Sequence, residues 1–433
     1  MTLKRIESAG NGRFPAGDAL RRFDGWRRRR GTLFGVLFMA STLVGIVALT
    51  ALIVSIVNDS FGYVAVQNER DPQALAALAM GQDAPGSPDV TLADLDKDAL
   101  VRILASGVSV GRMRALEAWQ PMKERTREDV LDLVVAEVVR PTIVRSWPLL
   151  HSLLNKADIE ATAAGIPDAN LEWRNWISWD FVASPQSSNP AIAGVRTAIF
   201  GSLWVVAISM FFAVPLGIGA AVYLEEYSDR NWFSNLVDTN INNLAGVPSI
   251  IYGLLGLAIF VRALEPLTSG AMFGASDPTT ANGRTALAAG LTLGLLTLPL
   301  IIINAREAIR AVPSSLREAS YGLGATRWQT VWSHVLPNAI GGILTGSILA
   351  VSRAIGETAP LVVVGASTFI TMDPSGPFSK FTVLPAQIYQ WTARPQAEFR
   401  NLAAAASLTL LLMLIVMNSV AVYLRNRYSS QRM

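Results

Sequence analysis

The sequence predicts an all-α polytopic membrane protein with six transmembrane helices and one mainly helical extracytoplasmic insert between the first two. Hydrophobic residues make up 51% of the 433 residues and charged residues only 16%, which is typical of a membrane protein that carries some soluble mass. Six apolar segments are long enough to cross a bilayer, and only a helical bundle suits segments of this length. Basic residues are distributed unevenly between the loops, which predicts the orientation of the bundle.

The N-terminal tail, residues 1–31, holds nine Lys or Arg, and Arg27 to Arg30 are consecutive. The tail directly precedes an uncharged apolar run, which we predict to be transmembrane helix 1 over residues 32–57. Basic residues beside a span are typical of an orientation signal that stays in the cytoplasm, so we expect lipid and not nucleic acid as the neighbour. The run is too long for the apolar region of a signal peptide, which favours a retained anchor.

Residues 60–190 have a different character, with 18 acidic and 12 basic residues and no stretch apolar enough to span. This length suits one small soluble domain. Apolar residues recur at helical intervals over Leu92 to Ala105 and over Thr126 to Val139, which predicts helices there. Asp83 to Asp89 has the composition of a turn-rich linker. Because the first span is predicted to run outward, we expect this insert to be extracytoplasmic.

Three tryptophans, Trp173, Trp176 and Trp179, precede the second span. They could contact a ligand, but a belt at the membrane interface is the favoured interpretation. His151 has neither a second histidine nor clustered acids beside it in the sequence, so we expect no metal site. The chain has no cysteine, which excludes disulfides, thiolate metal sites and cysteine nucleophiles.

The second half, residues 191–425, is predicted to be a permease domain with five further spans. These spans cover approximately Ile192–Leu224, Ile241–Val261, Thr285–Ile303, Ala339–Gly365 and Leu402–Leu424. The tails and short loops predicted to face the cytoplasm hold 17 Lys or Arg, against 5 in the loops on the other side. This asymmetry predicts that both termini, including the tail 426–433, and the segment 304–337 are cytoplasmic.

A short polar and aromatic segment, Glu318 to Pro337, lies between the fourth and fifth spans. It carries two capping-box signals for a helix start: Ser315 with Glu318, and Thr326 with Gln329. Gly322 and Gly324 lie between the two signals, and glycine can adopt the left-handed conformation that ends one helix and redirects the chain. The pattern therefore predicts two short helices joined by a sharp turn.

In the second short helix, Trp328, Val331, Trp332 and Val335 recur at helical spacing and predict one apolar stripe, with Pro337 closing the unit. A helix of two turns is marginal in water by itself, so this pair of helices needs a surface on which to lie. One candidate surface is the layer of lipid headgroups, where tryptophans are common. The other is a cytoplasmic protein partner.

Two charged residues, Arg353 and Glu357, lie within the predicted fifth span. Each charge in mid-membrane costs roughly 2.5–3.5 kcal/mol on insertion scales, so both should face protein or a water-filled path. Four residues apart, they lie on one helical face and can pair. They form either a structural ion pair or an anion path in which Arg353 binds the anion and Glu357 limits the affinity. Arg196 is a lesser candidate, and it could simply anchor the second span.

The segment Glu318 to Pro337 resembles the EAA loop of the ABC-importer permease family. The matching positions are Glu318, Ala319, Ser320, Gly324 and Val335 to Pro337, with His334 where many members have an aliphatic residue. In that family the loop forms the coupling helix, which fits a groove on the ATP-hydrolysing subunit. The predicted coupling residues are Glu318, Ala319, Ser320, Gly324, Trp328, Trp332, Leu336 and Pro337.

Residues 192–425 are similar to the PstA-type phosphate permeases of this family, in AGVRTAIFGSL, AVPLGIGAAVYLEEY, GVPSIIYGLLGL and RAIGETAPLVVVGA. The resemblance implies a multi-pass bacterial inner-membrane permease for inorganic phosphate, with Arg353 and Glu357 linked to phosphate passage. Its implied partners are a PstC-type permease, two PstB-type ATPase subunits and a periplasmic phosphate-binding protein. The chain has no P-loop, so ATP and Mg²⁺ belong to the ATPase and this chain binds no cofactor.

One departure concerns the fourth span. Many relatives carry an arginine a few residues beyond its proline, whereas here Ile303 and Asn304 follow Pro299 and Arg306 is the nearest cation. A second basic contact for phosphate therefore stays open. So do two alternative functions: a permease for another oxyanion or small solute, and a membrane sensor that uses residues 60–190. A secondary transporter is disfavoured because no inverted repeat is visible.

Overall fold

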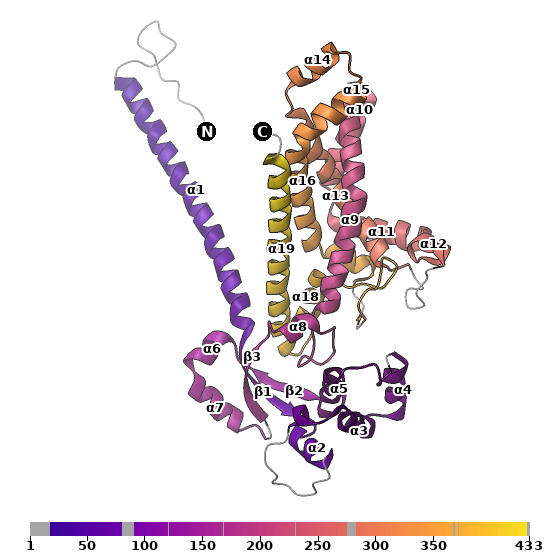
Figure 1. The fold of residues 1–433 in the computed structure, drawn as a ribbon. Helices are drawn as coiled ribbons and strands as arrows, with labels where there is room; N and C mark the ends of the chain where they lie inside the picture. The colour runs from indigo at the N-terminus through magenta and orange to yellow at the C-terminus, as the bar shows by residue number, and fades with distance from the viewer. Residues whose placement is uncertain are drawn as a thin grey trace. The chain divides into compact units, whose positions relative to one another are not determined.

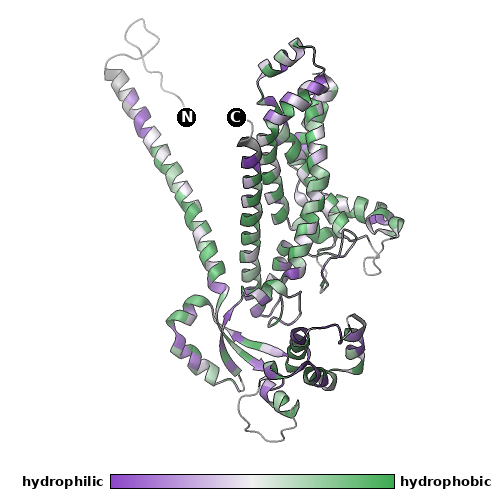
Figure 2. Cartoon of the chain, viewed as in Figure 1, coloured by the Kyte–Doolittle hydropathy of each residue, from purple (hydrophilic) through white to green (hydrophobic). Residues whose placement is uncertain are grey.

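The computed structural model describes residues 18–79, 91–119, 121–167, 169–229, 231–274, 283–366, 369–370 and 372–430. The predicted linker at 83–89 lies outside these residues. The chain divides into two compact units, residues 1–56 and 57–433, and each unit is treated separately below. Figure 1 shows the order of the elements, and Figure 2 shows that the long helices are predominantly apolar.

The first unit consists of most of helix α1 (Asp18–Asp59). Residues Trp26 to Asp59 are long and apolar enough to cross a membrane, and they include the predicted span 32–57. The helix begins before the apolar run, so Arg27 to Arg30 extend it by a further basic turn. The guanidinium of Arg30 lies 3.6 Å from the centre of the Trp26 ring, a cation–π contact suited to a membrane boundary.

The insert is built around a sheet that the sequence analysis did not predict. Strands β1 (Phe61–Asn68), β2 (Pro141–Ser146) and β3 (Ala169–Asn175) are antiparallel in the order β2-β1-β3. Two of the three strands are edges with mostly exposed or half-buried side chains, so their sequences lack the clean apolar alternation of a half-buried strand.

In the described part of the insert, seven α-helices surround this sheet or extend from it. They are α2 (Pro72–Ala79), α3 (Lys97–Gly107), α4 (Val110–Trp119), α5 (Arg127–Val134), α6 (Leu149–Leu154), α7 (Lys156–Ala164) and α8 (Trp179–Ala183). Helices α3 and α5 match the predicted helical segments. A capping box precedes α5, because Thr126 and Asp129 cap each other's backbone N–H groups. These hydrogen bonds from Thr126 hold the pKa of Asp129 below its usual value.

The predicted tryptophan belt is wrong for Trp176, whose side chain is 2% exposed in a core with Phe181 and Trp391. A residue enclosed by protein cannot lie among lipid headgroups. Trp173 and Trp179 are 46% and 81% exposed, so for them an interface position stays a prediction. The same core joins β1 and β2 to the helices α18 (Leu384–Thr392) and α19 (Glu398–Ser430).

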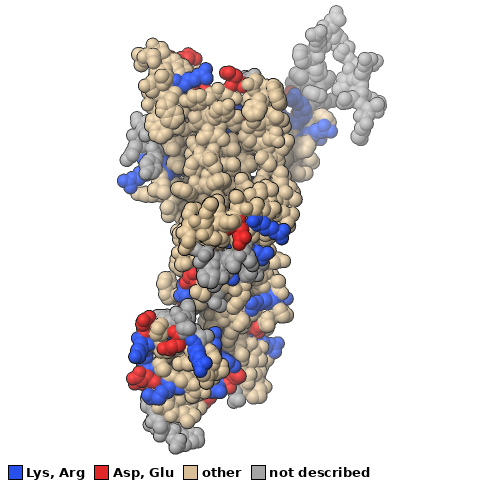
Figure 3. Space-filling model, turned by 90° about the vertical axis from the view of Figure 1, so that its right-hand side faces the viewer, with Lys and Arg blue, Asp and Glu red and all other residues tan. Residues whose placement is uncertain are grey.

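Four helices of the second unit are long and apolar enough to span a membrane. They contain α9 (Arg196–Val222), α13 (Ala286–Arg310), α16 (Leu336–Gly356) and α19, and they coincide with the predicted second, fourth, fifth and sixth spans. Helix α13 packs against both α9 and α16. On the face shown in Figure 3, charged side chains gather toward the two ends, and a broad band of the bundle carries little charge.

The third predicted span, Ile241–Val261, is wrong as a single straight helix. Helix α10 (Trp232–Ala245) and the helix Ser249–Ala263, which begins with α11 (Ser249–Gly256), meet at an angle of 102°. Pro248 lies at the break. Proline lacks the N–H that would continue the helix and disfavours helical conformation in the residue before it. The described chain thus has five straight candidate spans and one bent pair.

The fifth span is also shorter than predicted, because α16 ends at Gly356 and the backbone of Glu357 is extended. Pro360 accounts for this end, since its ring clashes with the carbonyl of the residue four positions earlier, which is Gly356. A new turn, α17 (Ala359–Leu361), begins after the break. Gly365 then adopts φ +146°, with the Arg284 side chain 3.0 Å from the position of a Cβ.

Glycines let α9 pack closely against its neighbours, and two of them provide a matched test. A Cβ at Gly201 would lie 2.0 Å from the carbonyl oxygen of Thr382, whereas a Cβ at Gly219 on the same helix meets nothing within 4 Å. We expect Gly201→Ala to cost about 1–3 kcal/mol of unfolding free energy. Gly219→Ala should be neutral or stabilise by up to about 1 kcal/mol. Thermal unfolding in detergent measures both, and equal melting temperatures would contradict the packing described.

Candidate functional site

The segment predicted to couple to a partner forms two helices, α14 (Ser314–Gly322) and α15 (Arg327–Thr330). Gly324 between them has φ +83°, as predicted for the glycine turn. The capping box of Thr326 and Gln329 forms. The predicted box of Ser315 and Glu318 is wrong: the cap of α14 is Pro313, two residues earlier, and Ser315 lies inside the helix.

The prediction that Pro337 closes the second short helix is also wrong. The chain is helical without a break from Arg327 to Gly356, a length of 30 residues. A π-helical turn at Val331–Val335 precedes Pro337. Because a π-helical turn bonds residues five apart instead of four, it can absorb the hydrogen bond that proline cannot donate. The coupling segment and the fifth span are therefore one helix.

The predicted apolar stripe divides into two faces. Val331 and Val335 are fully buried in a core with Ala305 and Ile309 of α13. Trp328 and Trp332 are 59% and 62% exposed, so they do not share this core. Their rings stack on each other with 5.6 Å between the ring centres. The valines fix the helix to the bundle, and the tryptophans form an exposed surface.

The other predicted coupling residues also fall into two groups. Ser320 is buried, and its hydroxyl lies 2.9 Å from the hydroxyl of Thr330, which ties α14 to α15. The exposed group comprises Glu318, Ala319 and Gly324, and Leu323 beside them is 91% exposed. We call the exposed group together with Trp328 and Trp332 the coupling surface. Leu336 and Pro337 are half-buried where the helix enters the bundle.

Two adjacent glutamates in the π-helical turn that follows α9, Tyr223–Tyr227, connect the coupling segment to the bundle. Glu226 lies 2.7 Å from the guanidinium of Arg317 on α14. The same guanidinium donates to the carbonyls of Ile309 and Val312 at the end of α13. The side chains of Glu226 and Arg317 are only 5% and 20% exposed, so this ion pair is largely shielded from solvent and fixes the base of α14.

Glu225 binds α13 on the other side, 2.8 Å from both Arg306 and Arg310. Arg306 also lies 2.6 Å from Asp238 on α10. Its side chain is 13% exposed, so the nearest cation to Pro299 is engaged by two carboxylates and is a poor second contact for an anion. The sequence analysis missed this network. Its one visible signal was the pair of acidic residues directly after an apolar span.

Breaking the pair on α14 gives a direct test of this role. We expect Arg317→Ala to lower the unfolding free energy by about 3 kcal/mol, because it leaves the buried carboxylate of Glu226 without its partner. Adding Glu226→Gln should recover part of the loss, since the unpaired charge is then gone. Thermal unfolding of the single and double variants measures this coupling, and purely additive losses would contradict it.

The predicted pair in the fifth span forms, with Arg353 Nε 3.3 Å from Glu357 Oε1. Arg353 is in the last turn of α16, and Glu357 caps that helix. Their side chains are 43% and 19% exposed, so the guanidinium is accessible while the carboxylate is half-buried.

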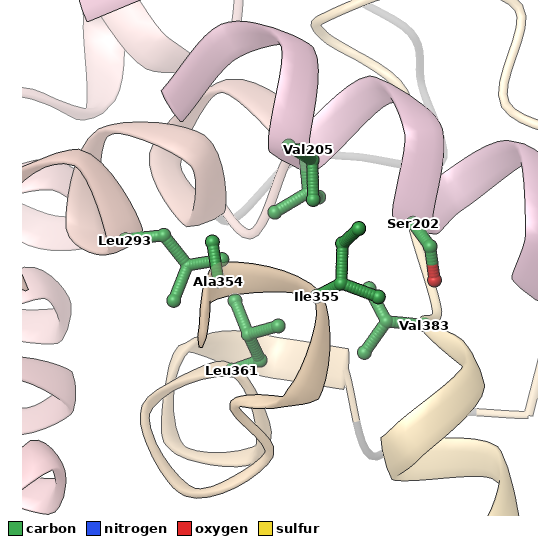
Figure 4. A pocket seen from close by; sticks show the side chains of 8 residues that line it. Ser202, Val205, Leu293, Ala354, Ile355, Leu361 and Val383 are labelled. Atoms are coloured by element: carbon green, nitrogen blue, oxygen red, sulfur yellow. The ribbon is translucent and has the colours of Figure 1, made fainter. Parts of the chain in front are cut away.

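The depth of this pair follows from its neighbours. Ala354 lines one crevice together with Ser202 of α9 and Leu293 of α13 (Figure 4). Ser202 lies in the second turn of α9, roughly 9 Å from the start of that helix at 1.5 Å per residue. Arg353 therefore lies at about this depth from the start of α9, nearer to the end of the bundle that joins the insert than to the coupling surface.

The crevice itself is not an anion site. It is too narrow for a water molecule, and its lining is apolar apart from Ser202: Ser202, Val205, Val206, Leu293, Ala354, Ile355, Leu361 and Val383. The Ser202 hydroxyl accepts a hydrogen bond from the Leu384 N–H, which ties α9 to the start of α18. Arg353 does not line this crevice, and its side chain is 43% exposed.

Arg196, the lesser candidate, lies 2.8 Å from Asp373 and donates to the carbonyl of Ala183 at 2.7 Å. These contacts fasten the start of α9 to the end of α8 and to the loop that holds Asp373. An arginine held in this way suits an anchor better than a substrate contact.

A family model described as "Binding-protein-dependent transport system inner membrane component" matches residues 213–430. The "Probable ABC transporter permease protein YqgI" of Bacillus subtilis (strain 168) is 32% identical over 57% of this chain and 83% of its own length. The "Phosphate transport system permease protein PstA 1" of Mycobacterium tuberculosis (strain CDC 1551 / Oshkosh) is 37% identical over 54% of this chain and 70% of its own length. A solved bacterial alginate ABC transporter has a TM-score of 0.44 and 18% sequence identity, and the match covers 63% of this chain and 88% of that chain.

The family model covers half of the chain, and the match spans most of the length of both relatives. Members of this family are membrane subunits whose ATP is hydrolysed by a partner and whose substrate arrives on a binding protein. The chain belongs to the family of binding-protein-dependent transport system inner membrane components and is the membrane-spanning permease subunit of an ABC importer, with no ATPase site of its own.

Proposed function

We propose that this permease subunit translocates inorganic phosphate across the bacterial inner membrane. The observation that carries the proposal is the Arg353–Glu357 pair, an accessible guanidinium held 3.3 Å from a half-buried carboxylate inside an apolar bundle. A relative with 37% identity that is named as a phosphate permease supports the same substrate.

The chemistry of the pair suits a passing oxyanion. A guanidinium offers a planar set of five donors that matches phosphate geometry. Glu357 engages Nε at one edge of the guanidinium, and we assign the two Nη groups to the anion. The nearby carboxylate repels the same anion, which keeps its binding weak enough for release, as a transport path requires.

The unbroken helix from Arg327 to Gly356 connects the two predicted sites. It carries Trp328 near one end and Arg353 near the other, and 30 residues extend about 45 Å. We infer that a partner ATPase docks on the coupling surface and that its movement reaches Arg353 through this helix. Two PstB-type ATPase subunits would bind ATP and Mg²⁺, so this chain needs no cofactor of its own.

The remaining partners follow from the same proposal. A PstC-type permease would complete the path, and a periplasmic phosphate-binding protein would deliver the anion on the side of the insert. The coupling surface and both termini would then be cytoplasmic, as the distribution of Lys and Arg between the loops predicts.

A competition experiment tests the substrate. Cells that lack their own phosphate importers and express the complete complex should take up labelled phosphate. Excess unlabelled phosphate should abolish this uptake, while excess sulfate or molybdate should leave it unchanged. If the cells instead take up labelled sulfate or molybdate, and excess phosphate does not reduce that uptake, the permease is specific for another oxyanion.

A further inference from the structure

Helix α6 of the insert exposes an apolar face that no described part of the chain covers. Leu150, Leu153 and Leu154 are 55%, 64% and 80% exposed, whereas Ser152 on the opposite face is 2% exposed. Three exposed leucines on six residues form a concentrated apolar patch. Patches of this kind usually mark a surface that contacts a partner or a membrane.

The start of α6 is attached directly to the end of the first candidate span. The backbone N–H of Leu150 donates to the side-chain oxygen of Asn58 at 2.8 Å. Asn58 is the first polar residue after the apolar run that ends at Val57. If α1 crosses the bilayer, this residue is at the boundary between the hydrocarbon and water, and α6 begins within one hydrogen bond of that boundary.

Backbone and side-chain contacts prevent α6 from turning away from this position. The Ser152 hydroxyl accepts from the Tyr63 N–H at 3.0 Å and lies 3.2 Å from the Trp147 carbonyl. Trp147 N–H in turn donates to the Tyr63 carbonyl. At Gly62 a Cβ would lie 2.0 Å from the Trp147 carbonyl oxygen, so the chain leaving α1 packs tightly against the residues that lead into α6.

A second attachment places the insert at the same boundary. The N–H of Val195, directly before α9, donates to the carbonyl of Phe181 in α8. Trp179 at the start of α8 is 81% exposed. The insert is thus fastened to the end of the first candidate span and to the start of the second. Each attachment has a large exposed apolar side chain beside it.

We propose that the leucine face of α6 inserts into the lipid leaflet that borders the insert and anchors the insert to the membrane surface. Lipid is favoured over a protein partner because the position of α6 is fixed by the end of the span. Lys156, which begins α7, is 60% exposed and lies 3.6 Å from the similarly exposed Glu160. An exposed lysine at this position can also bind lipid phosphates while the leucines contact acyl chains.

Site-directed spin labelling tests this anchor, and the chain has no native cysteine to interfere. The complete complex is reconstituted into phosphatidylethanolamine and phosphatidylglycerol vesicles with Leu154→Cys or Leu153→Cys carrying a nitroxide. Leu78→Cys is the matched control, because Leu78 is 69% exposed on α2, which among the described residues packs against α3 within the insert.

We expect both α6 labels to collide readily with oxygen, which concentrates in lipid. Their collisions with a water-soluble nickel chelate should be several-fold rarer than those of the control label. Collision with nickel at the level of the control would show that the face lies in water. Low collision with both reagents would show that a protein covers it. Either result would overturn the proposal, and neither depends on phosphate being the substrate.

Discussion

Replacing Arg353 by glutamine is expected to lower ATP-driven phosphate uptake while the complex still assembles. Glutamine keeps a polar side chain of similar reach but removes the charge and the planar set of donors. Hydrogen bonds to charged groups contribute about 1.5–3 kcal/mol, which corresponds to a loss of roughly ten- to a hundredfold. Initial uptake rates in proteoliposomes, normalised to the amount of assembled complex, measure the effect.

Arg400→Gln is the matched control, because Arg400 is an exposed arginine in the first turn of α19. It should leave uptake unchanged. If Arg353→Gln also leaves uptake unchanged, the Arg353–Glu357 pair is a structural ion pair and the anion path lies on other helices. A loss of assembly would give the same answer, because an anion contact is not needed to hold the subunits together.

Removing both exposed tryptophans of the coupling surface is expected to release the ATPase. Trp328 and Trp332 stack on each other and are more than half exposed, so Trp328→Ala with Trp332→Ala should leave the fold of this chain intact. Truncation of tryptophans at the centre of an interface costs at least about 2 kcal/mol, or about thirtyfold in affinity. Co-purification of the ATPase and ATP-driven uptake should fall together.

Trp179→Ala is the control for this pair, because Trp179 is a highly exposed tryptophan of the insert. It should not change ATPase association. If the double variant retains its ATPase and transports normally, the two tryptophans contact lipid headgroups instead, and the docking site has to be sought on Leu323 and the exposed face of α14.

The apolar spans could be predicted because the bilayer imposes a long uninterrupted pattern on the sequence. The break at Pro248 and the end of α16 before Pro360 could not be placed with the same certainty. Prolines are tolerated inside membrane helices when neighbours satisfy the freed carbonyls, and Pro215 and Pro299 do lie within continuous helices here. Whether a proline bends a span depends on packing that hydropathy does not encode.

The candidate site was predictable where a local rule applied. The Thr326 capping box, the turn at Gly324 and the pairing of Arg353 with Glu357 depend on short spacings, and all three form. The network of Glu225, Glu226 and their arginines joins residues more than 60 positions apart, so only the fold brings it together. The separation of the valines from the tryptophans likewise depends on where the bundle lies.

The most direct test of the central claim is the ATP-dependent accumulation of radiolabelled phosphate in proteoliposomes that hold this chain with its permease partner, its ATPase and a phosphate-loaded binding protein. We predict accumulation with ATP and none with a non-hydrolysable analogue. The claim would be contradicted if the same vesicles hydrolysed ATP and accumulated a different solute while phosphate stayed at background.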